Sequence, residues 1–515
     1  MISLKSWGVP FLALLAIIAF FQFVSPNIPE SDSFYYMGLG ALYSEQGIFN
    51  VDFPWIFHST IHTFSSSLWW GFGVVMLPFS LLPDQLLAIK IAGLIFGSLA
   101  LYAYYYVSRR EDLVMPLFWP FLLFFSAPNI LSRFLMVRPQ IISLPLSFLL
   151  FSGLLNNQSW LVFLASFGIA WFHLNFAWVP IMLLVIVMTA KLFFEKSFNW
   201  KPAMAVLSGV LLGWVARPQF WNAANLFYIQ IFQQIFEKQG GLPLLFGKEN
   251  LPLPASILFG NFLIILILWL AVIGVAAWMS SRSSRFQLGA KEKITLWTSI
   301  AISSIFFLLS IVVARRAYDF WVAFGVLAIA MAYSIIVRNS THLRLQSLAN
   351  NLMIGLWAAL VFLALFSGIK IIDALKQSYA PNELQEVSLW LKSNSKPGEI
   401  VFNLHWADFS PLFFWNRNNY YVGGLDPIFQ YSYDPSLYWK FHYLSTDQVT
   451  KKTCGAIECT SDQLVDTYGV LKNDFNAKYV VLTKKENPAV FQYLSSDSHY
   501  VKSFETEKEA VFFIK

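Results

Sequence analysis

The stretch ASILFGNFLIILILWLAVIGVAAWMS, residues 255–280, contains no Asp, Glu, Lys or Arg. A helix needs about 20 consecutive apolar residues to cross the hydrocarbon core of a bilayer, so this run is long enough to span a membrane. Ten further apolar runs begin at Trp7, Gln85, Leu113, Ile141, Trp160, Phe176, Pro202, Ile294, Phe320 and Asn351. We therefore predict an α-helical polytopic membrane protein with about 11 transmembrane helices.

The composition of the 515-residue chain points the same way. Hydrophobic residues make up 57% of it and charged residues only 12%, whereas soluble domains contain roughly 25% charged residues. This composition argues against a soluble enzyme and against a disordered scaffold. The formal net charge is +6, and no Lys- and Arg-rich block adjoins an aromatic platform, so we expect no nucleic-acid partner.

Basic residues predict the orientation. Residues 376–515 hold 14 Lys and Arg and 16 Asp and Glu, which leaves 21 and 13 for the first 375 residues. The loops assigned to the inside carry Arg109, Arg110, Lys191, Lys196, Lys201, Arg282, Arg285, Lys291, Lys293, Arg338 and Arg344. By the positive-inside rule we predict a multi-pass protein of the cytoplasmic (inner) membrane with a cytoplasmic N-terminus. The first apolar run follows Lys5 and lacks a signal-peptide cleavage pattern, so it should remain as an anchor.

One further apolar run, residues 68–82, is shorter and contains two glycines and Pro78. If it crossed the bilayer, every later basic loop would move outside, against the positive-inside rule. We therefore interpret it as a re-entrant or interfacial segment within a first outer loop over residues 25–84, although the sequence leaves a crossing open.

The composition changes abruptly after Lys370. We predict two domains: a transmembrane domain over residues 1–375, and a small soluble extracytoplasmic α/β domain over residues 376–515. Helices are expected at 382–394 and near 462–470, and strands at 399–404, 420–422, 478–483, 500–504 and 510–514. The only two cysteines, Cys454 and Cys459, form either a short-loop disulfide or two reduced thiols.

The first outer loop holds the leading candidate for catalysis. Residues 33–46 have helical spacing and end at Gly47, which places Asp32 at the start of a helix. The helix dipole favours an ionised carboxylate at this position. An ordinary helix cap is the alternative role for Asp32.

Several motifs resemble one family in the same order along nearly the whole chain. Asp32-Ser33-Phe34-Tyr35-Tyr36, followed by Gly47, Asp52, His58 and His62, resembles the first periplasmic loop of GT-C superfamily glycosyltransferases. This superfamily includes protein O-mannosyltransferases, aminoarabinose transferases and uncharacterised bacterial members. The remaining motifs are Arg138-Pro139-Gln140, Trp171-Phe172-His173-Leu174-Asn175, Arg217-Pro218-Gln219-Phe220-Trp221-Asn222, Arg315-Arg316-Ala317-Tyr318 and Gly423-Gly424-Leu425-Asp426-Pro427.

The resemblance implies transfer of a sugar from a polyprenyl-phosphate or pyrophosphate donor to an acceptor glycan, lipid or protein at the outer face of the membrane. It assigns Asp32 as the general base, which an inverting transfer needs in order to take the proton of the acceptor hydroxyl. The departing phosphate needs fixed positive charge. Arg138 and Arg217 are the preferred phosphate contacts, with Arg315 and Arg316 as further candidates. The alternative role for each arginine is to snorkel to lipid headgroups or to pair with Asp319 or Glu237.

Four more residues are candidates for the acceptor or the sugar: His58, His62, His173 and Asp52. Asp52 is also the reserve base. Asp32, His58 and His62 could together hold a divalent metal, which some members of the family use. The second outer loop, residues 128–140, has no carboxylate. We therefore favour acceptor or sugar contacts over a metal site for these residues, and we expect no other cofactor.

Two other function classes remain. One is a lipid or glycan transporter or flippase, but the predicted spans contain few ionisable groups apart from Lys90, and no paired half-repeats are visible. The other is a non-catalytic cell-envelope assembly protein whose C-terminal domain binds partners.

Overall fold

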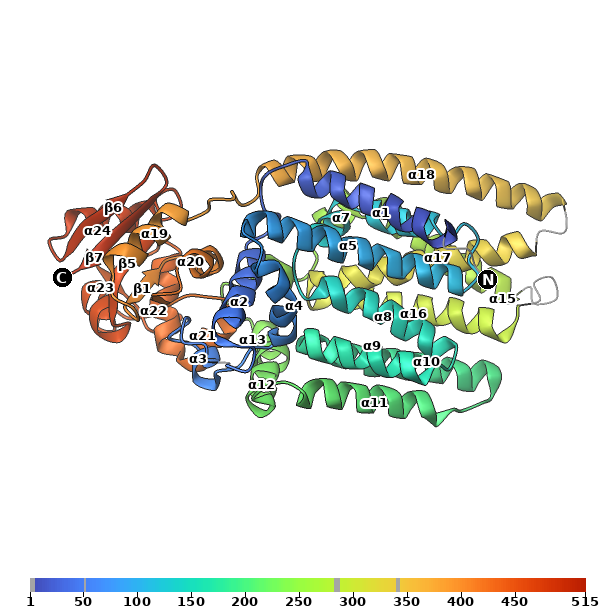
Figure 1. Cartoon of the computed structure of the whole chain (residues 1–515), viewed down its shortest axis with the longest axis horizontal. Coiled ribbons are helices and arrows are strands. Elements are labelled where there is room, and N and C mark those ends of the chain that lie inside the picture. Colours follow the sequence, from blue (N-terminus) through green and yellow to red (C-terminus); the bar gives the residue numbers. More distant parts are fainter. Residues whose placement is uncertain (1–4, 51, 282–287, 340–342) are drawn as a thin grey trace. The chain divides into compact units, whose positions relative to one another are not determined.

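The computed structural model describes residues 5–50, 52–281, 288–339 and 343–515 (Figure 1). Arg282 and Arg285, two of the basic residues used to predict orientation, lie outside these ranges. The chain forms two compact units. The first comprises Met1–Pro29, Lys90–Ala216 and Lys248–Ser378, and the second comprises Glu30–Ile89, Arg217–Gly247 and Tyr379–Lys515.

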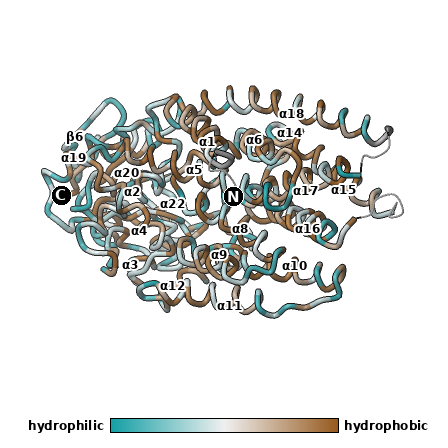
Figure 2. Tube along the Cα trace, turned by 45° about the vertical axis from the view of Figure 1, so that its right-hand side comes forward, coloured by the Kyte–Doolittle hydropathy of each residue, from teal (hydrophilic) through white to brown (hydrophobic). Residues whose placement is uncertain are grey.

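The first unit is helical throughout. Its elements are α1 (Lys5–Phe23), most of α5 (Gln85–Arg110), α6 (Phe118–Phe125), α7 (Pro128–Leu135), α8 (Gln140–Leu155), α9 (Ser159–Phe172), η1 (Leu174–Phe176), α10 (Trp178–Glu195), α11 (Trp200–Val215), η3 (Lys248–Asn250), α14 (Ala255–Asn261), α15 (Leu263–Ser281), α16 (Ala290–Val312), η4 (Arg315–Ala317), α17 (Tyr318–Arg338) and α18 (Leu343–Lys376). Figure 2 shows that hydrophobic residues predominate along the long helices.

Within the described ranges, six helices are long and apolar enough to cross a membrane, and the number rises to eight if each of two bent helix pairs is one span. The predicted spans that begin at Trp7, Ile141 and Trp160 correspond to α1, α8 and α9, whose apolar stretches are shorter, at 10–17 residues. All eleven predicted spans therefore fall on apolar helices. The polytopic helical architecture is confirmed, although length and composition alone qualify fewer spans than the eleven expected.

One bent pair shows how the sequence breaks a helix inside the apolar region. α6 and α7 meet at an angle of 104°, where Ala127 is extended and Pro128 occupies the first turn of α7. Proline cannot donate the backbone hydrogen bond that would continue α6, but it suits the first turn of a new helix. The hydroxyl of Ser367 donates to the carbonyl of Phe125 at 2.9 Å, which satisfies an acceptor near the break, as an apolar environment requires.

The second unit combines three segments of the chain. Its helices are α2 (Asp32–Gln46), α3 (Thr60–Phe64), α4 (Trp70–Ser80), α12 (Phe220–Phe227), η2 (Tyr228–Gln233), α13 (Gln234–Gln239), α19 (Gln385–Asn394), η5 (Trp406–Asp408), α20 (Phe409–Trp415), α21 (Pro427–Tyr433), α22 (Pro435–Ser445), α23 (Thr467–Gly469), η6 (Val470–Asp474) and α24 (Pro488–Ser496). Its strands are β1 (Ile400–Asn403), β2 (Tyr420–Tyr421), β3 (Lys452–Thr453), β4 (Val465–Asp466), β5 (Ala477–Thr483), β6 (Tyr500–Glu505) and β7 (Glu509–Ile514).

Five strands form a mixed sheet in the order β2-β1-β5-β7-β6. β1 runs parallel to β2 and β5, whereas β7 is antiparallel to β5 and β6. These strands occupy the five predicted strand positions, and α19 occupies the predicted helix at 382–394, so the small C-terminal α/β region is confirmed. The helix predicted near 462–470 begins later than expected: Val465 and Asp466 of β4 pair with β3, and α23 and η6 then follow from Thr467 to Asp474. The carboxylate of Asp466 accepts from the N–H of Gly469 and caps the start of this helical segment.

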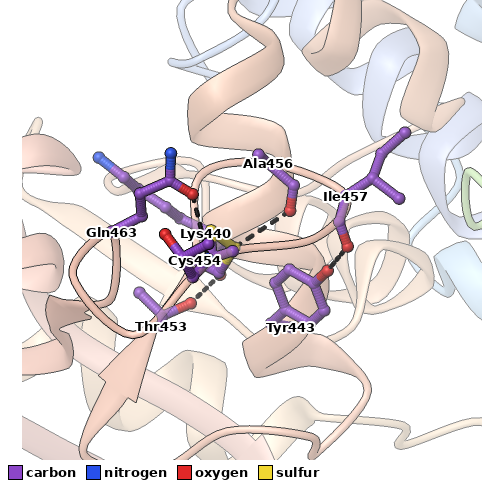
Figure 3. Close-up of a disulfide and its surroundings, with 9 residues drawn as sticks. Lys440, Tyr443, Thr453, Cys454, Ala456, Ile457 and Gln463 are labelled. Atoms are coloured by element: carbon purple, nitrogen blue, oxygen red, sulfur yellow. Dashed lines mark hydrogen bonds between the residues drawn. A yellow bond between two sulfur atoms is a disulfide. The ribbon is translucent and has the colours of Figure 1, made fainter.

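The cysteines form a disulfide between Cys454 and Cys459, with their Cα atoms 6.0 Å apart (Figure 3). It closes a loop directly after β3. The Cys454 sulfur contacts the carbonyl of Ala456, and the hydroxyl of Tyr443 on α22 bonds to the carbonyl of Ile457. Of the two predicted states of the cysteines, the structure contains the disulfide.

Residues 68–82, predicted as a re-entrant or interfacial segment, contain α4. At 11 residues this helix is about 16 Å long, roughly half the thickness of the hydrocarbon core. It packs closely on α2 through glycine. A Cβ atom on Gly40 would lie 2.9 Å from the carbonyl carbon of Met76, and one on Gly73 would lie 2.6 Å from Leu39. Only glycine at these two positions allows α2 and α4 to pack this closely.

Candidate functional site

Asp32 is the first residue of α2, as the sequence predicts. Ser31, which precedes it, makes no side-chain capping bond. At the other end Gly47 adopts φ 86° and donates its N–H to the carbonyl of Tyr43, a left-handed conformation that favours glycine. The Asp32 carboxylate therefore lies at the positive end of a 15-residue helix.

Asp32 is half-buried and belongs to a group of side chains that we call the Asp32 cluster: Glu30, Asp32, Tyr379 and Asp408. Burial raises the pKa of Tyr379, and the charges of Asp32, Glu30 and Asp408 raise it further, against a hydrogen bond with Ser31 that lowers it. The tyrosine therefore keeps its proton and can donate a hydrogen bond. The cluster brings a carboxylate and a phenol within electrostatic range of each other, a combination that suits binding and deprotonation of a hydroxyl group.

Asp408 adds a second kind of carboxyl group. Burial raises its pKa well above its usual range, and the charges of Glu486, Glu383 and Glu509 raise it further. Sequence reasoning missed both Tyr379 and Asp408. A signal was present for Asp408, because it follows closely on β1, and ligands bind beyond the carboxyl ends of parallel strands in open α/β sheets.

A small cavity of about 10 Å³ lies in the same unit. Its lining includes Tyr35, Ser67, Trp69, Leu425 and Phe429. A space of this size holds about one water molecule, so it is far too small for a sugar ring.

The two predicted histidines of the first loop both contact backbone within the second unit. His58 Nε2–H donates to the carbonyl of Phe475 at 3.1 Å, and His62 Nδ1–H donates to the carbonyl of Phe57 at 3.0 Å. Burial lowers the pKa of His58, which favours its neutral ring. His62 also stacks on the Phe57 ring. Asp52 is exposed.

The predicted metal ligands do not form a metal-binding group. In the part of the chain that the structure describes, no three His, Cys, Asp or Glu side chains are arranged to hold a metal ion. Asp32, His58 and His62 are thus not brought together as ligands.

Arg217 lies in the second unit and is buried, with 3% of its surface exposed. Its Nη2–H donates to the carbonyl of Ser67 at 2.7 Å. Nearby in sequence, the amide of Asn222 donates to the carbonyl of Phe64 at 2.8 Å. Residues 217–222 thereby hold the backbone of the first loop around residues 64–67.

The predicted phosphate contact Arg138 lies in the first unit, where it belongs to a compact ion network. Its Nη1 and Nη2 groups donate to the two carboxylate oxygens of Glu249, at 2.5 and 2.8 Å. Arg133 contacts the same carboxylate at 3.3 Å and Asp319 at 3.4 Å, and its guanidinium lies over the Tyr318 ring. We call this group, together with the adjacent Arg315 and Arg316, the Glu249 cluster.

The network is largely buried, since the side chains of Arg133 and Arg138 are 8% and 16% exposed. Burial alone would raise the pKa of Glu249, but the charges of Arg138, Arg133 and Arg316 outweigh it and hold the pKa well below its usual range. Four arginines face two carboxylates, so the cluster has a surplus of positive charge. The fork that Arg138 presents to Glu249 is the geometry that guanidinium also uses for phosphate.

Sequence reasoning considered pairing of the arginines with Asp319 and Glu237, but it missed Glu249. The Asp319 pairing is present for Arg133. The available signal for Glu249 was its position as a second carboxylate in the loop over residues 217–254.

His173 lies in the first unit. It is 4% exposed, its Nδ1 lies 3.0 Å from the hydroxyl of Ser143, and its ring packs on Phe176 at 4.2 Å. These contacts fix the turn between α9 and α10. Asp32, Arg217, His58, His62 and Asp52 belong to the second unit, whereas the remaining predicted site residues belong to the first.

No protein-family model matches the sequence, and no curated protein matches it. Two solved structures of the arabinofuranosyltransferase AftD from Mycobacteria, one of them of a mutant, are similar to the chain, each with 12% identity and a TM-score of 0.53. The similarities cover 100% and 99% of this chain and 40% and 42% of the AftD chains. This chain therefore spans less than half the length of those proteins. At this identity the likeness concerns the fold alone, and it agrees with the predicted polytopic membrane fold of the chain.

Proposed function

We propose that the protein is an inverting membrane glycosyltransferase that moves a sugar from a polyprenyl-phosphate or pyrophosphate donor to an acceptor at the outer face of the membrane. The carrying observation is the likeness in fold to an arabinofuranosyltransferase over the whole chain. The ordered motifs that resemble GT-C glycosyltransferases support the same reaction class.

In the proposed reaction the acceptor hydroxyl oxygen attacks the anomeric carbon of the donor sugar. The bond from that carbon to the phosphate oxygen breaks, and its electron pair leaves with the lipid phosphate. Asp32 takes the hydroxyl proton as general base. The position of Asp32 at the start of α2, within electrostatic range of the Tyr379 phenol, supports this role because a phenol can donate a hydrogen bond to the acceptor.

Fixed positive charge would bind the phosphate and stabilise it as it leaves. We propose Arg138, Arg217, Arg315 and Arg316 for this role. The bidentate pairing of Arg138 with a carboxylate shows that its guanidinium is presented to a forked anion. The acceptor and sugar contacts that we propose are Asp52, His58, His62 and His173.

The disulfide supports an extracytoplasmic position for the C-terminal region, because disulfides persist in oxidising compartments and are rare in the cytosol. This agrees with the orientation proposed from the basic loops, with the N-terminus in the cytoplasm.

Mass spectrometry of lipid-linked sugars and surface glycans in a deletion strain tests the proposal. Complementation with wild type should restore the missing glycan, whereas Asp32→Asn should lower its formation by at least about 100-fold, since a general base contributes about 10²–10⁴-fold. Immunoblots of membranes must show equal protein. Asp462→Asn, at an exposed carboxylate of the same unit that has no proposed role in the site, is the matched control and should retain activity.

Two results would contradict the proposal. Full activity of Asp32→Asn with loss in Asp52→Asn would move the base to Asp52. A deletion strain with unchanged lipid-linked sugars and glycans would remove the glycosyltransferase assignment and favour a non-catalytic envelope protein.

A further inference from the structure

The helical segment that opens with α12 and continues through η2 and α13, Phe220–Gln239, has an unusual distribution of polarity. Residues 218–236 contain no charged side chain. Four aromatic residues, which we call the aromatic stripe, project from the molecule: Trp221, Tyr228, Phe232 and Phe236, with 74%, 58%, 45% and 68% of their surface exposed. Spacings of seven, four and four place them along one face of the helix.

The opposite face packs on protein and carries amide side chains beside small and aliphatic ones. Ala223 and Leu226 are buried there, and Gln230 and Gln234 are each 4% exposed. Gln230 donates to the carboxylate of Asp426, and the Gln233 side chain accepts from the hydroxyl of Ser432 at 2.9 Å. A surface helix in water turns its large apolar side chains towards the core, whereas this one turns four aromatic rings outwards. The environment outside the aromatic stripe is therefore not expected to be water.

We propose that the aromatic stripe lies in the phospholipid interface of the membrane, so that residues 220–239 form an interfacial helix that attaches the second unit to the bilayer surface. The chain itself gives the location, because Phe220 follows the apolar helix α11 after only four residues, Ala216–Gln219. Trp and Tyr are enriched at membrane interfaces. Helices with one apolar and one polar face lie in the interface plane, about 5–10 Å into the boundary between headgroups and acyl chains.

The phospholipid interface fits the aromatic stripe better than a second protein does. The stripe has no charged residue that would select a partner, and its aromatic rings continue the apolar character of α11 along the chain. Through Asn222, Gln230 and Gln233 the helix is tied to segments 64–67 and 426–432 of the second unit. The proposed attachment would thus keep the unit that contains Asp32 at the depth of lipid headgroups.

Site-directed spin labelling of the full-length protein in phosphatidylcholine nanodiscs tests the inference. The two native cysteines are joined in a disulfide, so single cysteines at Tyr228, Phe232 or Phe236 take the label selectively. Oxygen, which partitions into lipid, and a water-soluble nickel chelate report the surroundings of each label. Val501 on β6, 43% exposed, is the water-facing control, and Leu270 on α15, 52% exposed, is the acyl-chain control.

We expect oxygen accessibility at all three stripe positions to exceed that of Val501 and nickel accessibility to exceed that of Leu270. Values equal to those of Val501 would overturn the inference. Protection of the labels from both oxygen and the nickel chelate would also overturn the inference and would indicate a protein partner. If that protection persisted in discs that hold a single copy, the partner would not be a second copy of this chain. Because these side chains are exposed, the substitutions remove no core contact.

A second measurement uses the unsubstituted protein. A photoactivatable phosphatidylcholine with its reactive group near the headgroup should label peptides from residues 220–239 and not peptides from β6. Absence of label on residues 220–239, with labelling of α15 from an acyl-chain probe as the positive control, would contradict the proposal independently of any mutation.

Discussion

The pairing of Arg138 with Glu249 leads to a quantitative prediction for a double-mutant cycle of Arg138→Gln and Glu249→Gln. Hydrogen bonds to charged groups contribute about 1.5–3 kcal/mol each, whereas exposed ion pairs contribute about 0.2–1 kcal/mol. The guanidinium of Arg138 and the carboxylate of Glu249 form two such bonds, at 2.5 and 2.8 Å. The side chains are 16% and 26% exposed, so solvent screens part of the attraction. We expect a coupling free energy of about 2 kcal/mol, between these limits.

Equilibrium unfolding in mixed micelles of a mild detergent and SDS gives the four free energies that the cycle needs. Glu195→Gln is the matched control, since Glu195 is an exposed carboxylate of the same unit, and it should change the free energy of unfolding by less than about 0.5 kcal/mol. A coupling at or below about 0.5 kcal/mol would refute the interpretation and make the fork equivalent to a surface pair.

The same pair predicts a pH dependence with a definite sign. The pKa of Glu249 is lower in the folded protein than its usual value of 4.5. The stabilisation is therefore present above that value and is lost as the pH falls through the folded-state pKa. The coupling should stay constant near neutral pH and decline only in acid. A decline of the coupling free energy at alkaline pH, without a decline in acid, would show that the coupling does not depend on the charge of Glu249.

Three further predictions concern the second unit. The pKa of Asp408 is raised well above its usual range, so the free energy of unfolding should fall as the pH rises from the usual carboxyl pKa towards the raised one. Asp408→Asn should flatten this slope in thermal melts at several pH values. Replacing Cys454 and Cys459 by serine should cost about 2 kcal/mol for a loop this short; dithiothreitol should lower the melting temperature of wild type but not of the variant. Gly40→Ala should destabilise by about 1–3 kcal/mol because its Cβ meets the Met76 backbone. Gly260→Ala, which meets no atom within 4 Å, should be neutral or stabilising by up to about 1 kcal/mol in the same melts.

Much of the fold could be predicted because it depends on local patterns. The apolar runs mark the membrane helices, and the five strands of the C-terminal sheet lie where β-branched and aromatic residues cluster. The helix expected near 462–470 begins only at Thr467, because strand pairing of Val465 and Asp466 with β3 overrides local propensity there. That pairing joins residues 12 and 14 positions apart across the loop closed by the disulfide, which no helical periodicity can reveal.

The candidate site was less predictable because its chemistry depends on contacts between distant segments. The sequence places Asp32 at a helix start, and this is correct. It does not reveal that Tyr379, about 350 positions later, shares its electrostatic environment. Nor does it reveal that Glu249 lies between Arg133 and Arg138. Such partners become visible only once the tertiary fold is known.

The same reasoning applies to the segment FWNAANLFYIQIFQQIF, residues 220–236. Its spacing separates an aromatic face from an amide-rich face, but spacing alone cannot say which face meets protein. In water the aromatic face would be buried, since each ring removed from solvent stabilises the fold. In the structure the aromatic rings are exposed instead, and the amide face packs on protein, where Gln230 pairs with Asp426 and Gln233 with Ser432. Hydrogen bonds lower the cost of burying amides, whereas leaving four large rings outside is favourable only next to lipid. The outward position of the rings therefore reflects the solvent that the helix faces, and the spin-label accessibilities of the aromatic stripe measure that solvent directly.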